Sequence, residues 1–228
     1  MPDDAAPRAC VFDAFGTLFD VRSLRDACEA FFPGRGDALA QLWREKQLQY
    51  SWLRTLMGRY ADFSRVTADA LAASLAALGL GADGEQQEEL LRAFARVEPF
   101  PEVRRVLESL EGYTRAIFTN GSPSMIADVV EHAGLAGMFE RIISVDPARR
   151  FKPRPAAYGL VPAALGLPAD RILFVSSNYW DAAGAKSYGF PSVWVNRTGA
   201  PPERLGIEPD HEVLSLDGLP AILGRSSL

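Results

Sequence analysis

The chain has 228 residues, of which 48% are hydrophobic and 23% are charged. This size and composition suit one domain, or a core with a smaller inserted domain, and exclude an intrinsically disordered chain. The formal net charge is −5 and no basic stripe is present, so nucleic acid is not an expected partner. The two cysteines, Cys10 and Cys28, form no disulfide framework. No signal peptide or membrane-spanning segment is visible, so we expect a cytoplasmic protein with no membrane partner.

Short apolar runs separated by helical patterns are predicted to form five strands: Ala9–Phe12, Arg115–Thr119, Arg141–Ser144, Arg171–Ser176 and Ser192–Val195. Strands that alternate with helices indicate an α/β fold with a parallel sheet and crossover connections. The tail after Thr198 is rich in Pro and Gly and is predicted to end in one short strand and one helix. In such sheets the carboxyl ends of the strands meet at one crevice, where ligands bind.

The segment from Val21 to about Glu98 contains no convincing strand, and its apolar residues recur at helical spacing. The Glu98-Pro-Phe-Pro sequence stops any helix, because proline cannot continue one. We therefore expect a helical cap over residues 21–97, inserted into a core over residues 1–20 and 98–228. The Gly79–Gly84 segment matches a dinucleotide fingerprint by letter, but it follows a helix, so we interpret it as a helix end and a turn.

Polar residues follow four of the predicted strands. They are Asp13, the Thr119-Asn120-Gly-Ser122 segment, Lys152-Pro153, and Ser176-Ser177-Asn178 with Asp181. Each has an ordinary structural interpretation: Asp13 could cap a turn or a helix, and Lys152-Pro153 could begin a helix. The occurrence of all four groups at strand ends favours a catalytic site instead.

These motifs together resemble the haloacid dehalogenase superfamily over nearly the whole chain. Longer segments resemble its L-2-haloacid dehalogenase branch: Asp13–Val21, Trp43–Leu48, Tyr50–Arg54, Ser176–Asp181 and Val195–Arg197. The resemblance implies a Rossmann-like core with a helical cap. It also allows a phosphatase of the same superfamily, or a catalytically silent relative that binds a small acid or a protein.

Position 15 distinguishes the dehalogenases from the phosphatases of this superfamily. The phosphatases carry a second Asp two residues after the nucleophile, and that position here is Phe15. After the fourth strand, Asp181 is the first acidic residue, whereas Mg²⁺ prefers several hard oxygen ligands. Halide needs no proton to leave. We therefore expect a dehalogenase that uses no metal and no cofactor.

The resemblance implies that Asp13 attacks C2 of a small L-2-halo acid, releases halide, and forms an ester that water hydrolyses to the D-2-hydroxy acid. Lys152 is expected to hold Asp13 ionised, Arg44 to attract the halide, and Asp181 to orient or deprotonate the water. Thr17, Ser176 and Asn178 complete the expected catalytic set. The residues expected to bind substrate are Ala14, Phe15, Leu48, Phe63, Thr119, Asn120, Tyr158 and Trp180.

Some positions depart from the family or have a simpler interpretation. Glu45 stands where an amide is expected beside Arg44, and we expect its carboxylate to repel halide. Arg44 itself could be a solvated helix charge, and Trp43 and Trp52 are better explained as core residues. Related dehalogenases are often homodimers, so a homodimer is a possible state of this chain.

Overall fold

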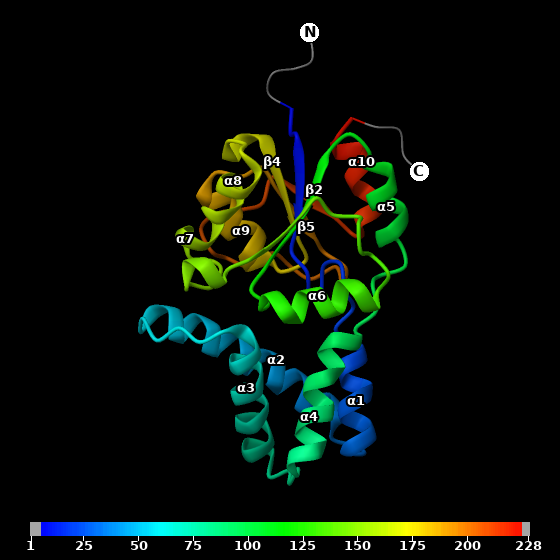
Figure 1. The fold of residues 1–228 in the computed structure, drawn as a ribbon, viewed down its shortest axis with the longest axis vertical. Helices are drawn as coiled ribbons and strands as arrows, with labels where there is room; N and C mark the ends of the chain where they lie inside the picture. Colours follow the sequence, from blue (N-terminus) through cyan, green and yellow to red (C-terminus); the bar gives the residue numbers. More distant parts are fainter. Residues whose placement is uncertain (1–5, 225–228) are drawn as a thin grey trace.

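The computed structural model describes residues 6–224 and contains one six-stranded parallel sheet (Figure 1). Its strands lie in the order β3-β2-β1-β4-β5-β6, and this confirms the predicted α/β fold with a parallel sheet. The strands are β1 (Ala9–Phe12), β2 (Thr114–Thr119), β3 (Arg141–Ser144), β4 (Ile172–Ser176), β5 (Ser192–Val195) and β6 (His211–Val213). The short strand predicted for the tail is β6, which extends the sheet at one edge.

Helices cover both faces of the sheet, because alternate residues of each strand point to opposite faces. Cys10 and Phe12 of β1 pack with the face formed by α5 (Val103–Ser109), α6 (Pro123–His132) and α10 (Leu219–Ile222). Ala9 and Val11 pack with the opposite face, formed by α7 (Pro155–Tyr158), α8 (Leu160–Leu165) and α9 (Tyr179–Tyr188). All four residues of β1 are fully buried, so the residue that follows β1 starts from a rigid central strand.

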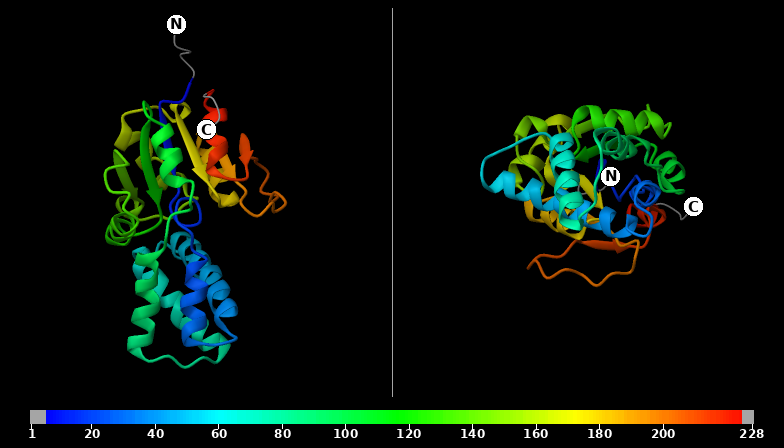
Figure 2. Two further views of the ribbon diagram at one scale, coloured as in Figure 1. Left: turned by 90° about the vertical axis from the view of Figure 1, so that its right-hand side faces the viewer. Right: turned by 90° about the horizontal axis from the view of Figure 1, so that it is seen from below.

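A separate group of helices lies below the carboxyl ends of the strands (Figures 1 and 2). It contains α1 (Ser23–Phe31), α2 (Gly36–Leu56), α3 (Phe63–Leu78), α4 (Gly84–Arg92) and the short 3₁₀ helix η1 (Ala93–Arg96). Gly79 ends α3 in the left-handed conformation with φ of 64°, and Asp83 caps α4. The interpretation of the Gly79–Gly84 segment as a helix end and a turn is therefore confirmed. The positions of these helices support the proposed cap, whose exact boundaries stay a prediction.

Two connections that run side by side join the cap to the core. The Asp20 amide donates to the Glu98 carbonyl at 2.8 Å, and the Phe100 amide donates to the Leu18 carbonyl at 2.9 Å. A second contact lies away from these connections, where the Ser64 and Ser122 hydroxyls are 2.8 Å apart. Within residues 6–224, no helix combines the length and the hydropathy that crossing a membrane requires.

Candidate active site

Asp13 directly follows β1 at the centre of the sheet, and its side chain is buried. Its Oδ1 accepts a hydrogen bond from Lys152 Nζ at 2.8 Å. Its Oδ2 accepts from Asn178 Nδ2 at 2.9 Å and from Thr17 Oγ1 at 3.2 Å. Donors on both oxygens and a neighbouring ammonium stabilise the carboxylate, which is the form that can act as a nucleophile.

A tight turn after Asp13 brings Thr17 back beneath it. The amides of Leu18 and Phe19 both donate to the Ala14 carbonyl, and Gly16 adopts a φ of 89°, which a residue with a side chain rarely adopts. Thr17 Oγ1 also accepts from the Ser177 amide at 2.8 Å. The turn therefore ties the end of β1 to the loop after β4, from which Asn178 reaches Asp13.

Lys152 lies between two buried carboxylates. Its Nζ is 2.5 Å from Asp181 Oδ2, and Tyr158 donates its hydroxyl to Asp181 Oδ1 at 2.7 Å. Burial alone would lower the pKa of Lys152, but Asp13 and Asp181 outweigh it and raise that pKa. Burial raises the pKa of Asp181 to about 6, against the opposing effect of Lys152. The ammonium thus bridges Asp13 to a second carboxylate behind it.

Arg44 approaches Asp13 from the cap. It belongs to α2 and lines the same cavity as Asp13. Burial lowers the pKa of its guanidinium and the charge of Asp13 opposes this, but an arginine stays protonated in proteins. Its Nη1 donates to the neutral Gln47 amide oxygen at 2.6 Å, and among the described residues no carboxylate forms an ion pair with it. The alternative interpretation of Arg44 as a solvated helix charge is therefore wrong.

The cavity between the cap and the core measures about 20 Å³. Its lining combines charged or amide groups with large apolar side chains: Asp13, Phe15, Arg44, Leu48, Phe63, Thr119, Asn120, Lys152, Asn178 and Trp180. We call it the catalytic cavity. A small organic anion with an apolar substituent matches such a lining.

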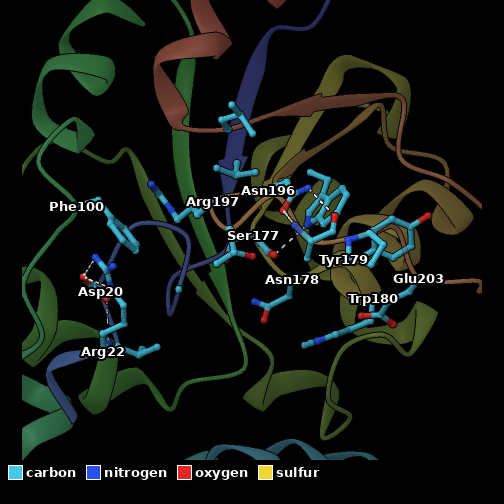
Figure 3. A pocket seen from close by; sticks show the side chains of 18 of the residues that line it. Asp20, Arg22, Phe100, Ser177, Asn178, Tyr179, Trp180, Asn196, Arg197 and Glu203 are labelled. Atoms are coloured by element: carbon cyan, nitrogen blue, oxygen red, sulfur yellow. Dashed lines mark hydrogen bonds and ion pairs between the residues drawn. The ribbon is translucent and has the colours of Figure 1, made fainter. Parts of the chain in front are cut away.

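A larger pocket of about 630 Å³ adjoins the catalytic cavity, and we call it the outer pocket (Figure 3). Leu48, Asn178 and Trp180 line both spaces, so these side chains separate the one from the other. Figure 3 labels Asn178 and Trp180 among the residues that line the outer pocket. The Trp180 ring is also held from the cap, because Trp52 packs edge-on against it with ring centroids 5.4 Å apart.

Five of the expected site residues lie behind the cavity wall rather than in it: Ala14, Thr17, Tyr158, Ser176 and Asp181. Thr17 contacts Asp13 directly, and Ser176 Oγ accepts from the Asn178 amide at 3.1 Å. Both oxygens of Asp181 are bonded, one to Lys152 and one to Tyr158. The expected role of Asp181 toward water stays a prediction, because Asp181 does not line the cavity and Lys152 lies between it and Asp13.

The expectation for Glu45 is wrong. Its side chain is exposed and accepts a hydrogen bond from Gln41 at 2.9 Å, because one residue along a helix turns the side chain away from the face of Arg44. The amide beside Arg44 belongs to Gln47, three residues on and fully buried. Gln47 was not among the expected site residues, although its i,i+3 spacing from Arg44 on a predicted helix was a signal for it.

Within residues 6–224, no cluster of three or more His, Cys, Asp or Glu side chains could hold a metal ion. The two carboxylates nearest the reaction centre, those of Asp13 and Asp181, both bind Lys152 Nζ instead. The Lys152 ammonium therefore occupies the position that a metal cation between the Asp13 and Asp181 carboxylates would need.

Comparison with known proteins agrees with this geometry. The sequence model of the haloacid dehalogenase-like hydrolase family matches residues 7–189. An (S)-2-haloacid dehalogenase of Pseudomonas sp. (strain YL) is 48% identical over 211 residues, which cover 92% of this chain and 91% of that protein. Haloacetate dehalogenase H-2 of Moraxella sp. (strain B) is 46% identical over 213 residues, which cover 92% and 95%. The structure of an L-2-haloacid dehalogenase from Xanthobacter autotrophicus with chloropropionic acid covalently bound superposes with a TM-score of 0.90 at 43% identity, covering 96% of this chain and 98% of that one. This chain belongs to the haloacid dehalogenase-like hydrolases.

Proposed function

We propose that this protein hydrolyses the carbon–halogen bond of short-chain L-2-haloacids and produces D-2-hydroxy acids. The observation that carries the proposal is the pairing of Asp13 with Arg44 across a small, partly apolar cavity, with Phe15 where a phosphatase would need an acid. The names of the relatives support the same reaction. A carboxylate can act as the nucleophile, and a guanidinium with no carboxylate partner can attract the departing halide.

In the first step, an oxygen of Asp13 attacks C2 of the substrate. The new C–O bond takes the place of the carbon–halogen bond, whose electron pair leaves with the halide toward Arg44. Thr119 and Asn120 are available for the substrate carboxylate. Asn120 Oδ1 already accepts from the Lys152 amide at 2.9 Å, so its NH₂ group is left to donate. Thr119 Oγ1 accepts from the Gly121 amide at 3.0 Å, which leaves its hydroxyl hydrogen for the substrate.

In the second step, water attacks the side-chain carbonyl carbon of the ester on Asp13. The water oxygen stays on Asp13, one water proton ends on the product hydroxyl, and the other is released to solvent. Asp181 is our candidate for the transient proton acceptor, since its raised pKa of about 6 suits a base near neutral pH. Asp181 does not line the cavity, so Lys152 passes one of its protons to Asp181 and takes one from the attacking water in its place. Attack opposite the halide inverts C2, and the second step leaves C2 untouched, so the product has the inverted configuration.

Substrate cannot enter the cavity in the arrangement described here. A volume of about 20 Å³ holds about one water molecule, and a 2-haloacid is several times larger. We infer that the cap separates from the core, or that Leu48 or Trp180 turns into the outer pocket. Closure afterwards excludes bulk water and strengthens the attraction between Arg44 and the halide.

The homodimer and the cytoplasmic location stay predictions. Three apolar side chains at the end of α2 support an association of subunits, because Leu53, Leu56 and Met57 are 43%, 78% and 63% exposed.

One assay tests the proposed function. The protein is incubated with L-2-chloropropionate, D-2-chloropropionate or p-nitrophenyl phosphate, each with Mg²⁺ or with EDTA, and chloride, phosphate and the configuration of lactate are measured. We expect chloride and D-lactate from the L substrate alone, and none from the Asp13→Asn variant. Phosphate release that requires Mg²⁺ would establish the phosphatase alternative, and release of neither ion would favour a silent relative.

A single turnover in ¹⁸O-water tests the covalent step. With enzyme in excess over L-2-chloropropionate, we expect unlabelled lactate at C2 and one ¹⁸O atom in the Asp13 carboxylate, read by mass spectrometry of the peptide. Label in lactate and none in Asp13 would mean that water attacks C2 directly and that Asp13 is not the nucleophile.

A further inference from the structure

A buried chain of hydrogen bonds extends from Arg44 into the cap. Arg44 Nη1 donates to Gln47 Oε1 at 2.6 Å, and Gln47 Nε2 donates to Thr67 Oγ1 at 2.7 Å. Thr67 Oγ1 in turn donates to the Phe63 carbonyl at 2.7 Å. Gln47 is fully buried and Thr67 is 1% exposed, so this chain links α2 to α3 away from solvent. Buried polar groups are almost always hydrogen-bonded, and each of these three side chains has a partner.

The chain fixes the orientation of the Gln47 amide. The single hydroxyl proton of Thr67 goes to the Phe63 carbonyl, so Thr67 Oγ1 can only accept from Gln47. Gln47 must then present its NH₂ group to Thr67 and its oxygen to Arg44. Thr67 is itself held in place, since the Trp43 indole donates to its carbonyl at 2.9 Å.

Gln47 orients Arg44 without neutralising it. A glutamine oxygen accepts one guanidinium proton and carries no charge, so the positive charge and the other N–H donors stay available to an anion in the cavity. A carboxylate at the same place would pair with Arg44 and cancel that charge. In a cavity that excludes water, a free cation attracts an anion more strongly than it does in solution.

We propose that Gln47, held by Thr67, is the positioning residue that points Arg44 at the departing halide, and that a neutral side chain is required there. The inference rests on the proposed function. It assigns a role in leaving-group stabilisation to two cap residues that do not line the catalytic cavity.

The test compares Gln47→Glu with Gln47→Met, and uses Gln49→Glu as the matched control. Gln49 lies on the exposed side of the same helix, where its oxygen accepts from Lys46, so this variant adds the same charge away from the cavity. Gln47→Glu keeps the shape and the acceptor oxygen but pairs with Arg44. We expect kcat/KM for 2-chloropropionate to fall about tenfold or more in both Gln47 variants, the scale of one lost charge-assisted hydrogen bond, and to stay unchanged in Gln49→Glu.

The choice of halogen separates positioning from folding. Bromide leaves more easily than chloride and needs less help from Arg44, so the ratio of kcat/KM for 2-bromopropionate over 2-chloropropionate should rise several-fold in the Gln47 variants. Thr67→Val should shift the ratio in the same direction, and Thr67→Ser should restore it. A purely structural role would lower both rates by one factor and lower the melting temperature, and it would leave the ratio unchanged. That outcome would overturn the inference.

Bromide binding to the resting protein, measured by calorimetry, does not depend on turnover. We expect the parent protein to bind bromide and Gln47→Glu to bind it at least tenfold more weakly, with the Gln49→Glu affinity unchanged. Equal affinities in the parent and Gln47→Glu, or no bromide binding by the parent, would overturn the inference. If no haloacid is turned over but bromide binding follows the expected order, the proposed function fails, whereas the orientation of Arg44 by Gln47 for anion binding stands.

Discussion

Replacing Lys152 by methionine removes one charge from a network whose geometry is fully described. The Lys152 ammonium contacts Asp13 at 2.8 Å and Asp181 at 2.5 Å, and its side chain is 1% exposed. Methionine has a similar length and suits the surroundings, since Lys152 Nζ lies near the rings of Phe118 and Phe174. The substitution therefore leaves two buried carboxylates without their cation, and changes little else.

The size of the effect follows from the cost of a buried charge that loses its partner. Removing one member of a buried pair costs about 3–5 kcal/mol. The variant can reduce this cost by binding a proton on Asp181, whose pKa burial already raises to about 6. At about 1.4 kcal/mol per pKa unit, the loss of Lys152 should raise the Asp181 pKa by roughly 2–4 further units.

This shift fixes the sign of the pH dependence. A carboxyl group whose pKa is higher in the folded than in the unfolded state stabilises the folded protein. This contribution is full below the unfolded-state pKa, near 4, and is lost as the pH rises through the folded-state pKa. In the parent the loss from Asp181 levels off about one pH unit above its pKa of about 6, whereas in Lys152→Met it continues to higher pH. The free energy of unfolding should therefore fall further below that of the parent with each pH unit above 6, by up to about 1.4 kcal/mol per unit.

Urea unfolding of both proteins between pH 5 and 8 measures this difference. Lys46→Met is the control, because the Lys46 ammonium contacts Gln49 and the ring of Tyr50 on the cap surface. The Lys152→Met variant should also lose at least about a thousandfold in halide release, since the charge that stabilises Asp13 is gone. A stability difference that stays constant from pH 5 to 8 would refute the buried two-carboxylate network.

Three further predictions concern the same network. Halide release should be unchanged by EDTA, because Lys152 occupies the place between the two carboxylates, and a strict Mg²⁺ requirement would contradict this. Tyr158→Phe should move the acid limb of the pH profile of kcat from near pH 6 upward by about one unit, because the Tyr158 hydrogen bond lowers the pKa of Asp181. An unmoved limb would mean that Asp181 takes no part in the rate-limiting step. Gly184→Ala should lower kcat about tenfold or more with the circular dichroism spectrum unchanged. The reason is that the alanine Cβ would lie 2.5 Å from Tyr158 Oη and 2.8 Å from Pro153 Cβ. Full activity would mean that the contact of Tyr158 with Asp181 is not needed.

The core half of the site could be predicted from the sequence because it depends on strand ends. A short apolar run followed by a polar residue locates both the strand and the edge at which it ends, and parallel strands bring those edges together. Asp13, Thr119, Asn120 and Asn178 all follow such strand ends and line the same cavity in the structure. The cap residues of the site, such as Arg44, were predicted only from the family resemblance. A helical period alone does not show which face of a helix covers the crevice.

The remaining parts of the site depend on packing between distant segments. The expectation for Glu45 was wrong because neighbouring residues of a helix point in different directions. Gln47, three residues from Arg44, shares its face instead. The reach of Tyr158 to Asp181 needs a close approach of α7 to α9 at Gly184, which no local pattern reveals.

The small volume of the catalytic cavity makes a last prediction about how substrate enters. Ser64 at the start of α3 and Ser122 at the start of α6 join the cap to the core, with hydroxyl oxygens 2.8 Å apart. Because these hydroxyl oxygens are in contact, cysteines at both positions would bring two sulfur atoms close together. The native cysteines, Cys10 and Cys28, are buried, and burial raises the pKa of Cys28 to about 11, so the Cys28 thiol does not compete as a thiolate.

If the cap must separate from the core to admit substrate, the oxidised Ser64→Cys/Ser122→Cys protein should release almost no halide, and a reductant should restore it. Each single variant should be indifferent to the reductant, which controls for loss of the Ser122 helix cap. Full turnover by the oxidised double variant would mean that the cap stays closed during the cycle. Substrate would then have to pass the wall shared with the outer pocket, and rotation of Leu48 or Trp180 would be the opening step.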